Sequence, residues 1–205
     1  MKKFLGFLCA VMMVFGMVAV GSATVLTFDD IGLGSEPIYD GYGGLNWDEM
    51  WYLNATQPEY SNSGYENGTV SGDYVAYNAW ANVATVEDGL FDFNGAYFTG
   101  AWRDGLNIRL RGFSGGSQQY ETTIVVDHTG PTWATADFLG IDRLEFYSFG
   151  GTQVDNLFGS GAHFAMDNFT FNETAPVPEP ATILLMGTGL LGMMGYGRKR
   201  LNKKA

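Results

Sequence analysis

Apolar and polar residues alternate with a period of two along this chain, in short runs broken by glycine and asparagine, and this pattern favours β-strands over helices. No window between residues 24 and 171 keeps the i, i+3, i+4 spacing of an amphipathic helix, whereas runs such as Gln118 to Val126 alternate. Turn residues recur about every 8–12 positions, which is typical of all-β domains. We therefore expect about nine to eleven short strands in an antiparallel β-sandwich.

The predicted strands fall where β-branched and aromatic residues gather between turn residues. Residues 103–105, Arg-Asp-Gly, are expected to close a hairpin, because Asp-Gly supplies the positive φ that tight turns need. Residues 114–117 form a second predicted turn, and residues 62–72 a long exposed loop. The clearest expected strands are Thr24–Phe28, Tyr74–Asn78, Gly89–Phe93, Ala96–Trp102, Leu106–Gly112, Gln118–Val126, Leu144–Phe149 and Phe164–Phe171, with residues 46–52 as an aromatic strand or loop.

The N-terminus has the three parts of a secretory signal peptide. Met1-Lys2-Lys3 is basic, Phe4 to Val20 is apolar, and Gly21-Ser22-Ala23 offers a small-residue cleavage site. Residues 1–23 are thus the predicted signal, expected to be helical. Cys9 lies inside the apolar part and is the single cysteine, so disulfides, thiolate metal sites and a cysteine nucleophile are excluded from the mature domain, which is predicted to span residues 24–171.

The C-terminus holds a polar motif, an apolar segment and a basic cluster in that order. Residues 172–177 are a proline-containing linker, and Pro178, Glu179 and Pro180 precede the apolar run 181–196. As a helix this run of about 16 residues spans about 24 Å, slightly less than the ~30 Å hydrocarbon core. The cations that follow favour a cytoplasmic end and act as a basic stop-transfer segment, with Arg198, Lys199 and Arg200 at its centre. Residues 178–204 are therefore a predicted transmembrane helix with its flanks.

This C-terminal arrangement resembles the PEP-CTERM sorting signal of Gram-negative bacteria that make exopolysaccharide. The resemblance covers residues 177–200 and implies recognition of the Pro-Glu-Pro motif, and removal of the helix, by a membrane-embedded exosortase. It implies export through the inner membrane, transient anchoring there, and a final place at the cell surface or in the extracellular matrix. An ordinary single-pass anchor with a chance Pro-Glu-Pro motif is one alternative. A glycine-rich dimerisation helix is a weaker one, because Gly189 and Gly192 lack the four-residue spacing that close helix packing prefers.

The charge of the predicted domain limits its partners. Residues 24–176 contain four arginines, no lysine and 21 acidic residues, which gives a formal net charge of −17. A field of this sign repels nucleic acid and anionic lipid, and favours cations or neutral polymers. Nucleic-acid binding is excluded on this ground.

A second resemblance concerns the domain. The pattern from Gly95 to Trp102, then Asp104-Gly105-Leu106, Gly112 and a tyrosine-containing strand, resembles the jelly-roll domains common among PEP-CTERM proteins. Those domains are similar in turn to carbohydrate-binding modules, so the resemblance implies a jelly-roll sandwich and a carbohydrate ligand.

Four oxygen-bearing residues at the two ends of the domain suggest a cation site. Jelly rolls often pair their first and last strands, which would bring Asp29 and Asp30 near Asp167 and Asn168. A buried carboxylate needs a partner, and Ca²⁺ suits an all-oxygen ligand set. The alternative is that Asp29 and Asp30 cap a turn while Asp167 is exposed.

Aromatic residues suggest a platform on which sugar rings stack. Trp51 and Tyr52 are adjacent and so point to opposite faces of a strand, and Trp102 lies beside the predicted hairpin; these three are the expected stacking residues. Trp47, Trp80 and Trp133 are further candidates. Because strand cores are also built from aromatic residues, most of them are expected to be structural.

Catalysis has little support in the sequence. His128 and His163 are the two histidines, and neither a His-Glu-x-x-His pair nor a Gly-x-Ser-x-Gly elbow occurs. We therefore predict an exported, non-enzymatic protein that associates with exopolysaccharide. A secreted glycoside hydrolase and a purely structural coat protein are the alternatives.

Overall fold

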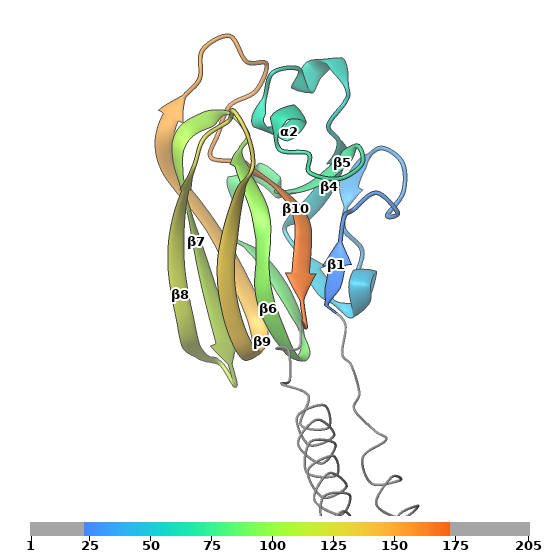
Figure 1. The fold of residues 1–205 in the computed structure, drawn as a ribbon, viewed down its shortest axis with the longest axis vertical. Helices are drawn as coiled ribbons and strands as arrows, with labels where there is room; N and C mark the ends of the chain where they lie inside the picture. Colours follow the sequence, from blue (N-terminus) through green and yellow to red (C-terminus); the bar gives the residue numbers. More distant parts are fainter. Residues whose placement is uncertain (1–22, 173–205) are drawn as a thin grey trace, which may run out of the picture. The chain divides into compact units, whose positions relative to one another are not determined.

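The computed structural model describes residues 23–172, and this part of the chain is an antiparallel all-β sandwich with very little helix (Figure 1). The predicted fold class is confirmed. Strands of the first half are short: β1 (Thr24–Leu26), β2 (Ser35–Pro37), β3 (Asn46–Asp48), β4 (Met50–Asn54) and β5 (Tyr74–Asn78). Those of the second half are mostly long: β6 (Ala84–Gly100), β7 (Arg103–Ser114), β8 (Ser117–Val126), β9 (Thr132–Gln153) and β10 (Phe164–Phe171).

Helical structure within the described residues is limited to short pieces in the first half of the chain. They are η1 (Tyr42–Gly44), η2 (Pro58–Tyr60), α2 (Gly64–Asn67) and η3 (Ala79–Ala81). Between residues 23 and 172 no helix is long and apolar enough to cross a membrane. The predicted signal helix and the predicted C-terminal transmembrane helix lie outside the described residues.

The strands form one ten-stranded sheet that is strongly curved. Its order is β2-β4-β5-β10-β6-β9-β7-β8, with β1 paired to β10 and β3 to β6. The expected pairing of the first and last strands is confirmed, since Leu26 lies opposite Phe169. Phe146 of β9 and Phe164 of β10 touch across the strand between them, with ring centroids 6.0 Å apart, so the inner face is concave. The main hydrophobic core fills this concave side with aromatic and aliphatic residues from nearly every strand.

Turn positions were predicted better than strand partners. Ser114 lies opposite Ser117, and Gly115 and Gly116 take positive φ values of 57° and 76°, so the predicted β7–β8 hairpin is confirmed. The hairpin predicted across residues 103–105 is wrong. β6 ends before this segment and β7 pairs with β8 and β9 instead, while Gly105 uses its φ of 64° for a bend inside β7.

A second, smaller hydrophobic cluster lies on the outer face of β4 and β5. The segment that was predicted to be an exposed loop, residues 62–72, contains α2 and covers this face (Figure 1). Tyr65 is 3% exposed and contacts Trp102 edge-on, with centroids 5.2 Å apart. Both faces of this part of the sheet are therefore covered. The cluster consists of Leu53, Ala55, Tyr65, Val75, Ala101, Trp102 and Ala165.

Candidate functional site

The residues predicted for sorting lie outside the part of the chain that the structure describes. These are Pro178, Glu179 and Pro180 of the motif and Arg198, Lys199 and Arg200 of the basic segment. The candidate site is therefore built from the side chains of residues 23–172.

Asp167, predicted as a calcium ligand, is fully buried, and its carboxylate holds backbone N–H groups. One oxygen, Oδ2, accepts hydrogen bonds from the N–H groups of Val70 and Ser71 at 2.7 and 2.9 Å. The other, Oδ1, accepts from the N–H of Asn168 at 2.6 Å and from the Ser71 hydroxyl at 3.3 Å. Burial raises the pKa of Asp167, and these hydrogen bonds oppose the rise. The neighbouring amide of Asn168 accepts from the same Ser71 hydroxyl.

Asp29 and Asp30 have partners of their own. Asp29 Oδ1 accepts the N–H groups of Asp73 and Tyr74 at 2.8 and 3.1 Å, and Asp30 Oδ1 accepts the Tyr42 hydroxyl at 2.8 Å. A side chain at Gly72, whose φ is 52°, would overlap the Asp29 carboxylate. Asp29 and Asp167 thus clamp the two ends of a short segment, residues 70–74.

This arrangement corrects the calcium prediction. Among the described residues no three His, Cys, Asp or Glu side chains are grouped closely enough to hold a metal ion. The premise that a buried carboxylate needs a partner was right, and N–H groups of residues 70, 71 and 168 supply it at Asp167. The alternative was right that Asp29 caps a turn and wrong that Asp167 is exposed.

Two of the three predicted sugar-stacking residues are buried. Tyr52 is 6% exposed and packs in the main core, where its ring lies 6.1 Å from that of Tyr74. Trp102 is also 6% exposed, because α2 and residues 154–162 cover it; a side chain at Gly159 would overlap its indole. Neither ring is available to a sugar, so these two predictions are wrong.

Trp51, the third predicted residue, is half-buried and lies beside the most exposed tryptophan of the domain. Trp80 is 75% exposed, and the two indoles meet edge-on with centroids 6.3 Å apart. Trp80 has φ 54° and Ala81 φ 56°, values that residues with a side chain rarely adopt. Such backbone strain costs about 1–3 kcal/mol per residue and persists only where the surrounding structure enforces it.

The surrounding structure does enforce this turn. The Asn78 side chain is fully buried, donates to Ser148 Oγ at 2.9 Å and accepts the Phe164 N–H at 2.9 Å, which ties the turn to β9 and β10. Glu49 accepts the Ala79 N–H at its carbonyl and the Asn82 amide at its carboxylate. The bend before β4 and the turn after β5 are therefore tied together, and this fixes the two tryptophans side by side.

The aromatic face continues across the sheet from Trp51. Tyr77 is its cross-strand partner on β5, and the Tyr77 ring lies 6.4 Å from that of His163. Burial lowers the pKa of His163, which favours the neutral form of the ring. Its Nδ1 lies 2.9 Å from the Asn78 carbonyl oxygen; because a carbonyl only accepts, Nδ1 carries the proton and Nε2 is left as an acceptor. We call Trp51, Tyr77, Trp80 and His163 the aromatic face.

A cleft of about 420 Å³ lies next to the aromatic face. Ser35 lines the cleft and its hydroxyl is 3.4 Å from that of Tyr77, so the two features adjoin. Tyr60 adds a ring to the cleft, while Asn54 and Glu59 add groups able to hydrogen-bond hydroxyls. Chemically, the site offers stacking surfaces and neutral or acidic hydrogen-bonding groups, without a lysine or arginine among the residues named.

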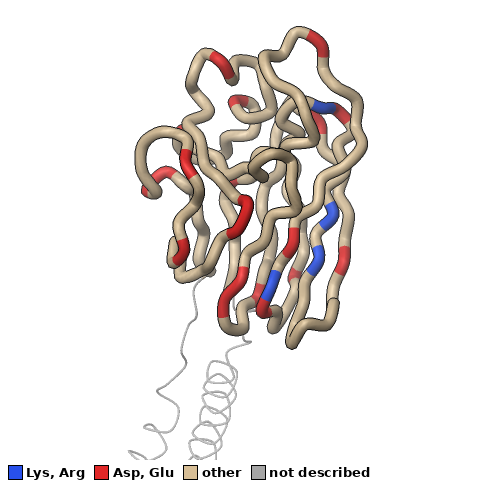
Figure 2. The backbone as a smooth tube through the Cα atoms, turned by 180° about the vertical axis from the view of Figure 1, so that it is seen from behind, with Lys and Arg blue, Asp and Glu red and all other residues tan. Residues whose placement is uncertain are grey.

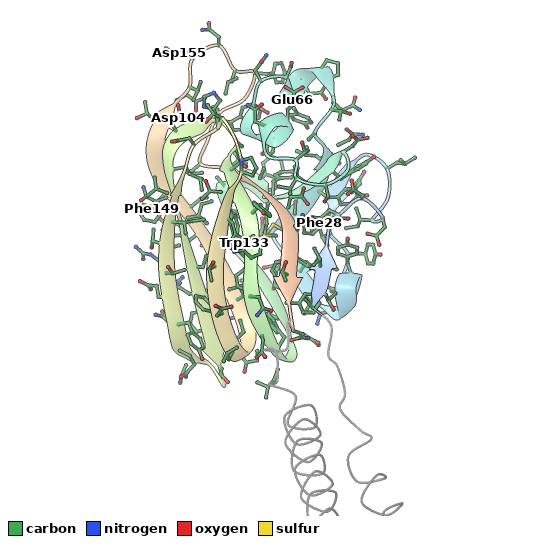
Figure 3. The ribbon with its side chains drawn as sticks, in the orientation of Figure 1. Phe28, Glu66, Asp104, Trp133, Phe149 and Asp155 are labelled. Atoms are coloured by element: carbon green, nitrogen blue, oxygen red, sulfur yellow. The ribbon has the colours of Figure 1, made fainter. Side chains whose placement is uncertain are left out.

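The other histidine and the remaining tryptophan lie in different places. His128 donates its backbone N–H to Asp104 Oδ1 and places Nδ1 2.6 Å from the same atom, which lowers the pKa of Asp104. Trp133 is 40% exposed, donates from Nε1 to Thr135 and contacts Tyr97 edge-on (Figure 3). Trp80 was considered in the sequence but not selected; the flanking Asn78 and Asn82, which are typical of a turn, were the signal that its ring is exposed.

Comparison with protein families matches residues 176–200 to the PEP-CTERM protein-sorting motif. This chain carries a PEP-CTERM sorting motif. The motif indicates an exported protein that is handled through its C-terminal region, as the resemblance in the sequence implied. The match covers the motif alone and leaves the domain of residues 23–172 unassigned. No curated protein sequence matches the chain.

Several solved structures resemble the domain at low identity. A DUF4465 family protein from Bacteroides caccae has a TM-score of 0.47 and 12% identity, covering 76% of this chain and 88% of its own. A DUF4465 family protein from Bacteroides ovatus has a TM-score of 0.41 and 10% identity, with coverages of 73% and 93%. TmCBM61, solved with β-1,4-galactotriose, has a TM-score of 0.35 and 10% identity, with coverages of 62% and 86%.

Proposed function

We propose that this PEP-CTERM protein is exported, anchored transiently in the inner membrane and processed by an exosortase. It is then displayed at the cell surface or in the matrix. There its domain binds neutral carbohydrate of an exopolysaccharide, without catalysing a reaction. One observation carries the carbohydrate proposal: Trp80 is 75% exposed in a strained turn, with Trp51 edge-on beside it. Because backbone strain at Trp80 keeps its indole exposed to water, we infer that the exposed ring serves to bind a ligand.

The chemistry of the aromatic face suits a sugar ring. The apolar C–H face of a pyranose stacks on an indole, while the ring's hydroxyls need hydrogen-bonding partners at the edge. Trp80 and Trp51 supply the first, and His163 Nε2 with the Ser35 cleft supplies the second. The net charge of −17 favours a neutral sugar at this face, since Glu36, Glu49 and Glu59 lie on or near the segments that form it.

The same residues support binding over hydrolysis. A glycosidase of the usual kind needs two carboxylic groups on either side of the scissile bond, about 5–9.5 Å apart. The Glu49 carboxylate, on the bend next to the tryptophans, is engaged by Asn82. His163 donates its Nδ1–H to the Asn78 backbone carbonyl, which leaves Nε2 as an acceptor for a sugar hydroxyl. No observation here favours the hydrolase alternative.

The test is binding of the purified protein to a panel of neutral polysaccharides (β-glucan, galactan, mannan and xylan) by affinity electrophoresis. We expect at least one to retard the wild type, and Trp80→Ala to weaken that binding about 30-fold, as loss of a 2 kcal/mol stacking contact would. Trp133→Ala is the matched control, because it removes a partly exposed tryptophan elsewhere on the domain, and it is expected to bind like the wild type.

Three results would overturn the proposal. Equal binding by Trp80→Ala and the wild type would remove the aromatic face from the site. Release of reducing sugar that depends on a carboxylate would favour the hydrolase. Absence of binding to every neutral polymer would leave a structural coat protein.

A further inference from the structure

The few cations of the described residues are concentrated on one surface. Residues 23–172 contain four arginines and no lysine, and Figure 2 shows them against many acidic positions. The guanidinium of Arg103 already has backbone partners, because it donates hydrogen bonds to the carbonyl oxygens of residues 150, 151 and 161. The other three, Arg109, Arg111 and Arg143, lie on β7 and β9, whose cross-strand register places them on the outer face of this pair.

Two of these three arginines are neutralised locally. Glu145 is largely buried and receives Arg111 at 2.6 Å and Arg143 at 3.1 Å. Arg143 also lies over the Phe113 ring, 4.1 Å from its centroid. These three residues form a compact ion cluster that holds β7 and β9 together, so Arg111 and Arg143 are not available to a ligand.

Arg109 differs from the others. Within residues 23–172 it forms neither an ion pair nor a side-chain hydrogen bond, although Glu121 and Glu145 lie diagonally across on the neighbouring strands. Its guanidinium lies over the ring of Phe149, 5.2 Å from the centroid. In a domain with this excess of carboxylates, an arginine without a carboxylate partner is unexpected.

Aromatic rings flank Arg109 on the outer side of β9. Tyr147 is its cross-strand partner, is 38% exposed and stacks on Phe149 with ring centroids 5.3 Å apart and planes 19° from parallel. Figure 3 places Phe149 on the side of the β7–β8–β9 layer that faces away from β10. On β8, the partner of Arg109 is the exposed Thr123, which adds a hydroxyl. The result is a half-buried guanidinium, whose Nε is buried without a hydrogen-bond partner, bordered by stacked rings and an exposed hydroxyl.

We propose that Arg109, Tyr147, Phe149 and Thr123 form a second binding site, which takes the carboxylate of an acidic saccharide directly. A guanidinium fork matches a carboxylate in a bidentate geometry, and the adjacent rings give the sugar an apolar surface. One carboxylate contact in a negative surrounding is weak, so the site suits a polymer that presents the same group repeatedly and binds with avidity. That requirement favours an acidic polysaccharide over a single acidic ligand.

This site goes beyond the neutral-sugar proposal and is independent of it. Net charge alone suggests that acidic sugars reach the domain only through bridging divalent cations. A free arginine makes direct contact possible at one place, while the rest of the surface still repels polyanions. The protein would then hold two kinds of sugar residue on two different surfaces.

The test is binding of polygalacturonate to the purified full-length protein in EDTA, which removes bridging cations. We expect the wild type to bind, with binding that falls as salt rises. Arg109→Gln is expected to lose at least tenfold in affinity, and Arg109→Lys, which keeps the charge but not the fork, to fall between the two. Asn156→Asp, in an exposed loop, gives the same net charge as Arg109→Gln and is expected to stay within twofold of wild type.

The controls separate this proposal from the first. Trp80→Ala is expected to bind polygalacturonate normally, and Arg109→Gln to bind the neutral polymers normally. Polygalacturonate binding that is absent in EDTA, or equal in Arg109→Gln and wild type, would overturn the second site. Equally tight binding of poly-glutamate would overturn the saccharide assignment in favour of an acidic protein partner.

Discussion

Replacing Asp167 by asparagine tests the claim that this carboxylate is a clamp for a loop. The side chain is fully buried and accepts four hydrogen bonds, two at each oxygen. Asparagine keeps the shape but turns one acceptor oxygen into an NH₂ group. Whichever way the amide is turned, at least one backbone N–H of residue 70, 71 or 168 then faces a donor.

The expected cost follows from these contacts. A buried donor left without an acceptor costs about 1–3 kcal/mol, and the bonds that remain lose their charge assistance. Part of this loss is offset, because the neutral asparagine side chain does not carry the desolvation cost of a buried charge. The net destabilisation is about 2–3 kcal/mol, which for a domain of this size lowers Tm by roughly 4–12 °C.

Thermal unfolding followed by circular dichroism measures the effect. Asp155→Asn makes the same chemical change in an exposed loop (Figure 3) and is expected to stay within about 0.5 kcal/mol of the wild type. EDTA is expected to leave the Tm of the wild type unchanged, because N–H groups occupy the carboxylates. An unchanged Tm in Asp167→Asn, or a wild-type Tm that falls with EDTA and recovers with Ca²⁺, would refute the clamp.

Two further predictions concern the same loop and the aromatic face. Gly72→Ala is expected to destabilise by about 2–4 kcal/mol, because its Cβ would strike the Asp29 carboxylate at a φ of 52°. Gly115→Ala is the control, since Gly115 has a similar φ of 57° with open space around it and should cost less; chemical denaturation measures both. Because burial lowers the pKa of His163, the unfolded chain binds its proton more readily, so stability is expected to fall as pH drops below about 6.5. His163→Gln should flatten that part of the pH–stability profile, and a profile identical to the wild type would contradict the assignment.

Local pattern predicted strands well where alternation ended in clear turn residues. Tyr74–Asn78 and Phe164–Phe171 were predicted with the bounds that β5 and β10 have. Partners were not predictable in the same way, since alternation says which residues share a face and not which strand lies beside them. The segment after Trp102 was for this reason assigned to a hairpin with β6, although β7 pairs with β8 and β9.

The site was predicted in part for a similar reason. The adjacency of Trp51 and Tyr52 places them on opposite faces, and a sheet with one covered face would expose one ring fully. Here Tyr52 points into the main core on the inner face. Residues 62–72 cover much of the outer face, so Trp102 is buried in the smaller cluster there and Trp51, at the edge of the covered area, is only half-exposed. The Asp167 clamp depends on residues 96 and 97 positions away, and Arg109 meets Tyr147 only through the β7–β9 register. No local pattern encodes these contacts.

Carbohydrate binding at the aromatic face can be followed directly at the indole N–H resonances of the five tryptophans, assigned by single Trp→Phe variants: Trp47, Trp51, Trp80, Trp102 and Trp133. During titration with a neutral oligosaccharide cut from a polymer that binds, the resonances of Trp80 and Trp51 are expected to shift together along one saturating curve. Those of Trp47 and Trp102, which are buried, and of Trp133, which lies elsewhere, are expected to stay in place. A saturating shift confined to Trp133, or saturation with Trp80 unmoved, would contradict binding at the aromatic face.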